Sequence, residues 1–303
     1  MKRNWLISTV LAVLTFGLCL SLQSCATNKI NLRKTLDTQE TLQVQAYWDP
    51  IADTSLGLPD HSPKHAALFK NLSPAHVSRE YDVAAFKAFF PKGSVPVGHV
   101  WKLDMNEVLP FLHQFHPGAT GEMHINPGGE SFIEIFGKRI VLEKVGLESE
   151  GAFACLRALS PTYAEIVFRI HAEFLLDKEA RAYFTPAQFT GRLILNRNNG
   201  TIRDFRLHLP QRKTNVDINA FGGADMVYVP RMELIAQNAH DQSDIVWETS
   251  MTEADAKSAL ETSFYKSAEI ERLPVEEAVT QAQAEHRPIH VVLTWGVFDD
   301  ESC

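Results

Sequence analysis

The stretch from Phe189 to Leu209 reads FTGRLILNRNNGTIRDFRLHL, with Asn198-Asn199-Gly200 between two apolar halves. An Asn-Gly pair favours a tight turn because both residues accept positive φ angles at low cost. Both halves are rich in the branched and aromatic residues that are typical of strands. The stretch therefore predicts a β-hairpin with strands at Phe189–Leu195 and Ile202–Leu209.

Neighbouring segments extend this pattern into a β-rich middle region. In Tyr163–Leu175, apolar residues alternate with polar ones, which predicts one half-buried strand. Met226–Ala236 predicts another strand, and Pro230 within it indicates an edge or a bulge. Phe132–Phe136 and Ile140–Val145 are candidates for a second hairpin. We expect an antiparallel sheet from these segments.

Helical signals lie on both sides of the sheet region. Before it, Val108, Phe111, Leu112 and Phe115 have the i, i+3, i+4, i+7 spacing of one buried helix face. After Asn238 the strand pattern ends and a polar segment follows.

In that last part, Thr252 with Asp255 predicts a helix start, and Pro274 with acidic residues behind it predicts a second helix to about Glu285. An apolar strand at Ile289–Trp295 follows, and then an acidic turn. Helix, strand and then a cysteine form the opening of a thioredoxin-like domain, which would be incomplete here.

The first 25 residues predict a targeting segment. Lys2 and Arg3 precede an uncharged apolar run, Leu6–Leu22, that is short for a spanning helix of about 20 residues. Leu22-Gln23-Ser24-Cys25 resembles a bacterial lipobox, in which the cysteine is acylated. We therefore expect a lipoprotein anchored through Cys25 in the bacterial cell envelope, facing the periplasm, with the outer membrane favoured. The alternatives are an ordinary signal peptide or a single anchor helix.

Composition and charge narrow the function classes. The chain has 29 basic and 37 acidic residues, and without residues 1–24 the balance is 27 − 37 = −10. This acidity argues against nucleic acid and against a broad basic membrane-binding face as partners. Of the four cysteines, Cys19 and Cys25 belong to the targeting segment, so Cys155 and Cys303 are too few for a disulfide framework. We expect Cys155, within an apolar run, to be a core residue.

The most informative motif is Trp295-Gly-Val-Phe-Asp-Asp-Glu-Ser302-Cys303. It resembles the approach to the active site of the selenoprotein N family, whose motif is Ser-Cys-Sec-Gly, and Ser302 and Cys303 match the first two positions. The resemblance runs from roughly Leu109 to Cys303. It includes, in family order, the stretches Gly151–Leu156, Phe168–Phe174, Phe184–Gly191, Arg203–Leu207 and Asn215–Ile218.

This resemblance implies a thiol–disulfide (selenenyl-sulfide) oxidoreductase, with Cys303 as a catalytic residue, Ser302 as its motif neighbour and selenocysteine immediately after Cys303. The expected partners are oxidised protein thiols or another redox protein. The motif is cut after Cys303, so we expect the chain as given to be inactive. Animal relatives carry an EF-hand, but no such loop is found in this sequence, so calcium binding is not carried over. The alternative is a non-enzymatic, membrane-tethered binding or scaffold module.

A metal site is a third, weaker hypothesis. His113, His116, His124 and the pair His171 and Glu173 are possible ligands, but their spacing matches no metal motif. We favour surface or satisfied histidines, and we expect neither a metal nor another cofactor.

Together these features predict an α+β chain with four parts. Residues 1–25 form the lipoprotein signal peptide, and residues 26–80 a tether with an irregular segment. Residues 81–240 form a mixed body with the antiparallel sheet, and residues 245–303 the start of the thioredoxin-like domain.

Overall fold

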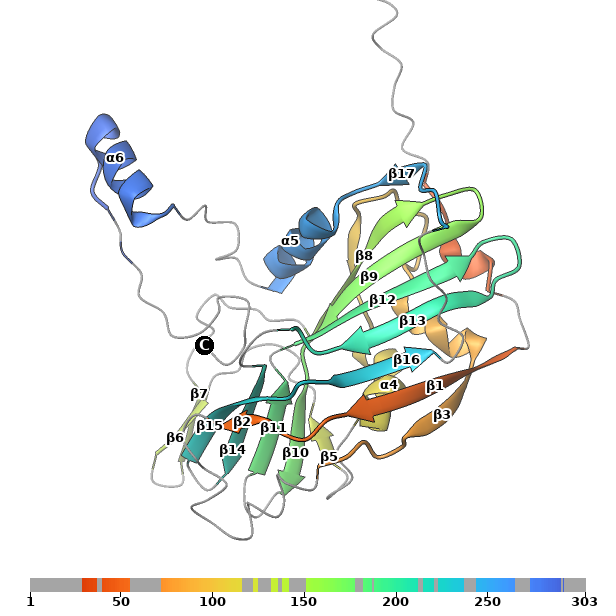
Figure 1. Ribbon diagram of the computed structural model, residues 1–303, viewed down its shortest axis with the longest axis horizontal. Coiled ribbons are helices and arrows are strands. Elements are labelled where there is room, and N and C mark those ends of the chain that lie inside the picture. Colours follow the sequence, from red (N-terminus) through yellow and green to blue (C-terminus); the bar gives the residue numbers. More distant parts are fainter. Residues whose placement is uncertain are drawn as a thin grey trace, which may run out of the picture.

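A computed structural model of the chain describes residues 29–36, 40–54, 72–115, 122–124, 132–135, 138–141, 151–177, 182–186, 188–211, 215–220, 223–236, 244–264, 273–289 and 291. Within them the fold is α+β and built mainly on antiparallel sheets, as the sequence predicted (Figure 1). All strand pairings in the described residues are antiparallel.

The larger sheet has nine strands. Their order is β17 (Thr249–Ser250), β8 (Ala152–Leu159), β9 (Tyr163–Ile170), β12 (Phe189–Asn196), β13 (Ile202–His208), β16 (Met232–Ala236), β1 (Thr41–Trp48) and β3 (Ser78–Asp82), and β4 (Val100–Lys102) also pairs with β8. The order of the six-stranded sheet is β2 (Asp53–Thr54), β15 (Gly223–Tyr228), β14 (Val216–Ala220), β11 (Ala182–Pro186), β10 (Glu173–Asp177) and β5 (Glu122–His124).

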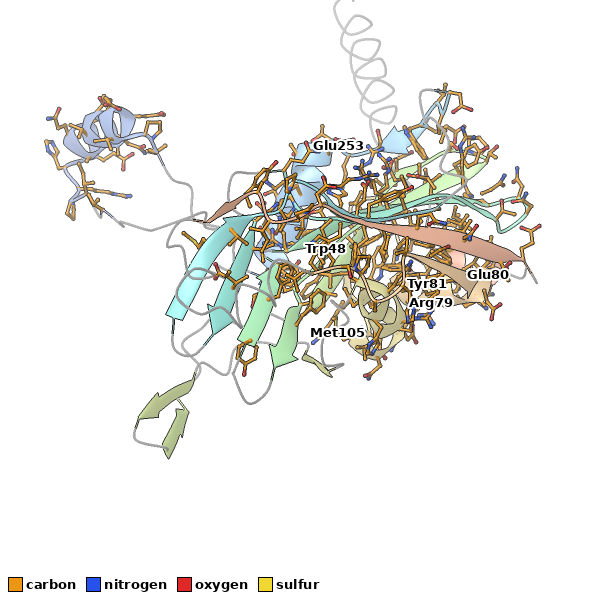
Figure 2. The ribbon with its side chains drawn as sticks, turned by 60° about the horizontal axis from the view of Figure 1, so that its bottom comes forward. Trp48, Arg79, Glu80, Tyr81, Met105 and Glu253 are labelled. Atoms are coloured by element: carbon orange, nitrogen blue, oxygen red, sulfur yellow. The ribbon has the colours of Figure 1, made fainter. Side chains whose placement is uncertain are left out.

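Shorter elements complete the described fold. A separate pair joins β6 (Phe132–Ile135) to β7 (Lys138–Val141). The helical elements are η1 (Leu32–Lys34), η2 (Val83–Phe89), α4 (Met105–Phe115), α5 (Glu253–Phe264) and α6 (Val275–Glu285). In Figure 2 the nine-stranded sheet lies between α5, marked by Glu253, and α4, marked by Met105.

The predicted central hairpin is confirmed. β12 and β13 pair along their length, with Arg192 opposite Arg206. Gly200 has a φ of +74° in the turn, which a residue with a side chain rarely adopts. The predicted hairpin at Phe132–Phe136 and Ile140–Val145 also forms, but its strands are Phe132–Ile135 and Lys138–Val141.

Two segments that were predicted as single strands each divide between the two sheets. Tyr163–Leu175 becomes β9 and β10, with His171 and Ala172 between them, and Met226–Ala236 becomes β15 and β16. Pro230 lies in the second break, where its missing N–H removes a ladder bond. The prediction that β9 is half-buried is also wrong, because Glu165 and Arg169 on its polar face are buried as well.

The predicted tether and irregular segment need a correction. Residues 41–48 form β1, which pairs with β16 on one side and β3 on the other. Leu42, Val44 and Ala46 alternate along it and are buried. These three apolar positions carry the period-two signal of a strand, although the polar residues between them give the segment the composition of a linker. The targeting segment, residues 1–25, lies outside the described residues.

The start of the predicted thioredoxin-like domain also differs from expectation. The capping pair is confirmed, because the Asp255 N–H donates to Thr252 Oγ1 at 3.0 Å. However, α5 packs on β8 and β9 of the large sheet, so the predicted boundary at 245 does not separate it from the body. α6 follows Pro274 as predicted and has no buried residue. Most of the predicted strand Ile289–Trp295 lies outside the described residues, so the thioredoxin-like fold stays a prediction.

A cluster of phenylalanines fills the space between the large sheet and the helices η2 and α4. Phe89 lies 4.4 Å from Phe168 of β9, and Phe86 lies 5.0 Å from Phe205 of β13, between ring centroids. Phe111 of α4 contacts Phe205 at 5.4 Å. All five rings are fully buried. Each such aromatic pair contributes about 0.5–1.5 kcal/mol beyond the burial of its area, so this cluster fixes α4 on the sheet.

The predicted buried face of α4 is confirmed and includes one polar residue. Val108, Phe111, Leu112 and Phe115 are buried, together with Gln114. Gln114 donates to the carbonyl of Val44 at 2.9 Å and accepts a hydrogen bond from the Tyr81 hydroxyl at 2.9 Å. Burial raises the pKa of Tyr81 to about 12, so the hydroxyl keeps its proton as a donor.

The phenylalanine cluster depends on a close approach at Gly191. A Cβ atom added at Gly191 would lie 2.1 Å from Cε2 of Phe168 and 2.8 Å from the carbonyl oxygen of Arg206. We expect Gly191→Ala to lower the free energy of unfolding by about 1–3 kcal/mol, as overpacking does. The measurement is the urea unfolding midpoint at an unchanged m-value. Gly93→Ala is the matched control, because a Cβ there meets nothing within 4 Å. Equal midpoints for the two variants would contradict the prediction.

Candidate functional site

The residues predicted to carry chemistry are mostly not described by the structure. Cys25, Ser302 and Cys303 lie outside the described residues. Their predicted roles as lipid anchor, motif neighbour and redox cysteine therefore stay predictions. Cys155 is described, and it is a free cysteine.

Cys155 is a core residue, as predicted. It lies on β8, opposite Val167 of β9, and is fully buried. Its thiol lies 3.6 Å from the thioether sulfur of Met251. Burial raises the pKa of Cys155 to about 11, so the reactive thiolate is scarce at neutral pH. These surroundings describe a packing residue rather than a redox residue.

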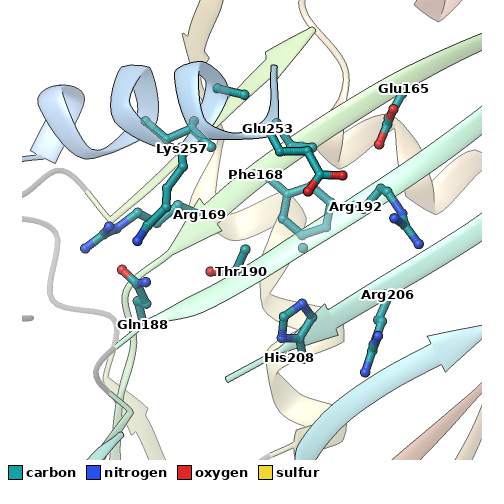
Figure 3. Close-up of a pocket in the computed structure, with 14 residues that line it drawn as sticks. Glu165, Phe168, Arg169, Gln188, Thr190, Arg192, Arg206, His208, Glu253 and Lys257 are labelled. Atoms are coloured by element: carbon teal, nitrogen blue, oxygen red, sulfur yellow. The ribbon is translucent and has the colours of Figure 1, made fainter. Parts of the chain in front are cut away.

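A pocket of about 270 Å³ lies between α5 and the face of the large sheet opposite the phenylalanine cluster (Figure 3). Side chains of directly paired strand residues share one face of a sheet. The row of Val167, Arg192 and Arg206 therefore faces the pocket, whereas the next row, Phe168, Gly191 and Leu207, faces the cluster.

α5 is held over the sheet by its C-terminal end. Phe264 stacks on His171 with ring centroids 4.1 Å apart and meets the edge of Phe153 at 5.0 Å. The guanidinium of Arg169 lies 5.3 Å from the centre of the Phe264 ring. Ala256 and Leu260 are buried on the same side of the helix. These contacts hold α5 over the pocket, and Lys257 and Glu253 of this helix are among the residues that line it.

Charged pairs cover the sheet face around the pocket. Arg192 pairs with Asp204 at 3.0 Å, Arg206 pairs with Glu233 at 2.6 Å, and Arg157 pairs with Glu165. Burial alone would raise the pKa of Glu233, but hydrogen bonds from Arg231 and Arg206 lower it below its ordinary value. The carboxylates of Asp204 and Glu233 are thus held by arginines that also face solvent.

One end of the pocket combines cations with a buried amide. Figure 3 shows Arg169, Lys257 and Gln188 together there. Arg169 and Lys257 both lie near one carboxylate, that of Glu261, at 3.7 Å and 3.3 Å. Gln188 is 2% exposed, and its Oε1 atom has no hydrogen-bond partner. The Oε1 atom of Gln188 can therefore accept a hydrogen bond from a donor in the pocket.

His208 supplies a second acceptor to the pocket. Its Nδ1 lies 2.8 Å from the Leu209 carbonyl, which can only accept, so Nδ1 is the donor and Nε2 has a free lone pair in the neutral ring. Burial lowers the pKa of His208, and the nearby Arg206 and Arg192 lower it further. The ring is therefore neutral at pH 7.

The metal hypothesis gains no support in the described part of the chain, where no group of three or more His, Cys, Asp or Glu residues is placed to hold an ion. His171 is buried, and its Nε2 accepts a hydrogen bond from Arg169 at 2.8 Å. It is a satisfied core histidine, which is the interpretation that the sequence favoured. His116 lies outside the described residues.

The sequence did not predict the pocket. Its lining comes from β9, β12 with the residue before it, β13 and α5, and it spans 95 residues of sequence from Glu165 to Leu260. The alternating charges of Arg203-Asp204-Phe205-Arg206 are, taken alone, typical of an exposed strand face with paired charges. One signal that could have indicated a covered face is that the neighbouring strands β9 and β12 also carry arginines on their polar sides, at Arg169 and Arg192.

Comparison with known proteins identifies the family. The chain is similar to selenoprotein N of Danio rerio, with 31% identity over 87% of the chain, and to selenoprotein N of Homo sapiens, with 30% identity over 88%. The protein of Mus musculus is 29% identical over 88% of the chain. The chain therefore belongs to the selenoprotein N-like family.

The match covers about half of each relative, 56%, 52% and 56% of their lengths. No model of a protein family matches the chain, and no solved structure matches it. None of the helices in the described residues has the length and apolar character needed to cross a bilayer.

The burial of Cys155 predicts a thiol that reacts only after unfolding. We expect Cys155 to resist alkylation by iodoacetamide in the folded protein at pH 8, because the thiolate is scarce and the side chain is fully buried. In urea above the unfolding midpoint it should react at the rate of a free cysteine. Mass mapping of the peptide that contains Cys155 measures both. Rapid labelling of that peptide in the folded protein would contradict the prediction.

The lowered pKa of His208 predicts a loss of stability in mild acid. Below the ordinary histidine pKa of 6.5, the unfolded chain takes up a proton at His208 before the folded chain does. The free energy of unfolding must then fall as pH falls, by up to about 1.4 kcal/mol for each unit of pKa difference. Urea unfolding between pH 7.5 and pH 5 should show a shallower fall for His208→Gln than for the wild type. Identical pH dependence in the two proteins would refute this assignment, and the exposed His76→Gln controls for the substitution.

Proposed function

We propose that the chain carries part of the redox site of a thiol–disulfide oxidoreductase, with Cys303 as one member of the exchange pair and selenocysteine as the other in the full-length product. The observation that carries this proposal is membership of the selenoprotein N-like family. The match of Ser302 and Cys303 to the first two positions of the Ser-Cys-Sec-Gly motif adds residue-level support.

The proposed reaction is a two-electron exchange. The selenolate attacks one sulfur of an oxidised protein disulfide, and the other substrate sulfur leaves as a thiolate that takes a proton. The Cys303 thiolate then attacks the selenium of this mixed intermediate and releases the second substrate thiol. The disulfide is reduced to two thiols, and the pair is oxidised to a selenenyl sulfide, which another dithiol protein reduces again.

The setting that suits this chemistry is the start of a thioredoxin-like domain. In it, a strand at Ile289–Trp295 would carry the motif to the N-terminus of a helix, where the dipole favours the anionic form of the pair. The acidic turn Asp299-Asp300-Glu301 lies directly before the motif. Cys155 is unsuited to the same role because its burial raises its pKa to about 11.

We further propose that the protein is tethered to the bacterial envelope, facing the periplasm, through acylated Cys25. The support is the basic start at Lys2 and Arg3, the apolar run and the lipobox-like Leu22–Cys25. In that compartment, oxidised protein thiols are the expected class of substrate, since disulfides form and persist there.

The test is the protein purified from its native host after growth with selenite. We expect an intact mass with a selenium isotope pattern, an added lipid mass on the peptide that begins at Cys25, and turnover of insulin disulfides. Cys303→Ser should reduce turnover to the level of a free thiol, because the exchange pair loses one member. Cys155→Ala, which alters a core residue, is the matched control and should keep the turnover. A selenium-free protein, or unchanged turnover in Cys303→Ser, would refute the proposal.

A further inference from the structure

We propose that the pocket between α5 and the large sheet binds a small uncharged molecule with a carboxamide or lactam group, in which an N–H donor lies beside a carbonyl acceptor. This site goes beyond the proposed redox function and shares no residue with it. Its lining comes from described residues of β9, β12, β13 and α5, and from Gln188 directly before β12 (Figure 3).

The amide of Gln188 sets the first requirement. This side chain lines the pocket and is 2% exposed, and its Oε1 atom has no hydrogen-bond partner among the described residues. An unpaired buried amide oxygen costs about 1–3 kcal/mol, and an apolar residue of similar size would avoid this cost. The same amide carries N–H donors beside the oxygen. A carboxamide on a ligand is complementary to it, because the ligand N–H can donate to Oε1 while the ligand carbonyl accepts from Nε2.

The strands beneath α5 add further uncharged polar groups. Thr190 of β12 lies directly opposite His208 of β13, so their side chains share the sheet face that lines the pocket. The neutral ring of His208 has a free lone pair on Nε2, because its Nδ1 donates to the Leu209 carbonyl. Figure 3 shows Gln188, Thr190 and His208 along the side of the pocket that faces α5. A second N–H of the ligand can therefore find an acceptor on this side.

The charged side chains of the lining argue against an ionic ligand. Ion pairs within the fold hold five of them: Glu165, Arg169, Arg192, Arg206 and Lys257. Glu253 is exposed at the start of α5, where water and salt screen its charge. A charged ligand would lose hydration on entry and would have to compete with these pairs. An uncharged ligand avoids both costs.

The remaining walls of the pocket are apolar, and the pocket is small. Val167 of β9 and Ala256 and Leu260 of α5 supply these walls. Small-molecule sites typically combine such walls with a few converging polar groups. The volume of about 270 Å³ is below the range of roughly 300–1,000 Å³ that drug-sized ligands occupy. The expected ligand therefore has one short, branched apolar group beside its amide.

4-Methylpentanamide is a suitable probe, because it joins a carboxamide to a short branched chain. We expect it to bind the full chain saturably in a titration followed by saturation-transfer NMR. Two molecules with the same carbon skeleton separate the contributions. Methyl 4-methylpentanoate lacks the N–H donors, and 4-methylpentanoate replaces them with a negative charge. Each should bind at least about fivefold more weakly, which is the effect of losing one hydrogen bond.

Protein variants assign the binding to the pocket. Gln188→Leu removes the amide at similar volume, so it should weaken 4-methylpentanamide by about fivefold or more. It should not lower the urea unfolding midpoint of the ligand-free protein, since the oxygen that it removes has no partner. Val167→Phe, at a half-buried position on β9, reduces the volume of the pocket and should prevent saturable binding. Gln281→Leu on the exposed α6 is the matched control and should bind as the wild type does.

Four results would overturn the proposal. The first is the absence of saturable binding of 4-methylpentanamide up to its solubility limit. The second is an affinity equal to that of the wild type in either pocket variant. The third is a clear fall of the unfolding midpoint in ligand-free Gln188→Leu, which would make Gln188 a structural residue. The fourth is binding of 4-methylpentanoate as tight as that of the amide. Weaker binding in both pocket variants, with wild-type binding in the control, would support the proposal.

Discussion

The contact between the ring of Phe168 and the backbone of Gly191 is the constraint on which the rest of the structure depends. Because Gly191 has no side chain, the ring of Phe168 can approach β12 closely and meet Phe89 at 4.4 Å. Phe205 and Phe111 then join the same cluster, and α4 is fixed on one face of the sheet. The core continues without a break into the second sheet, where Phe174 lies 6.1 Å from Phe189. One packed layer of rings thus holds both sheets together.

Since the apolar side chains go to that layer, the opposite face of the sheet is left to charged residues. Arg157 with Glu165, Arg192 with Asp204, and Arg206 with Glu233 are ion pairs whose carboxylates are almost fully buried. The loss of hydration offsets much of the attraction in such pairs, so their net contribution to stability is small. Removing one partner would nevertheless leave a buried charge, which costs about 3–5 kcal/mol. The pairs therefore act mainly to fix where each arginine lies, and this order makes a defined pocket beneath α5 possible.

Local patterns in the sequence predicted most of the helices and strands, but they did not predict how the strands divide between the two sheets. Asn199-Gly200 set the central hairpin, and the spacing of Val108, Phe111, Leu112 and Phe115 set the buried face of α4, because both signals act within a few residues. The division of Tyr163–Leu175 at His171 depends on pairing with distant strands, and no local signal records it. β1 was interpreted as tether because its polar residues dominate its composition, although Leu42, Val44 and Ala46 alternate. The pocket was beyond prediction for the same reason: Gln188 is informative only once α5 is known to cover it.

The position of α5 links the apolar core to the charged face of the large sheet. Its hold on the sheet rests on Phe264, Leu260 and Ala256, and burying a large apolar side chain contributes about 1.5–3 kcal/mol. That is enough to hold the helix on β8 and β9, yet modest beside the ring cluster on the other face. The unpaired Oε1 of Gln188 beneath the helix has a cost of the same order, about 1–3 kcal/mol. The packing of α5 on the sheet must offset this cost.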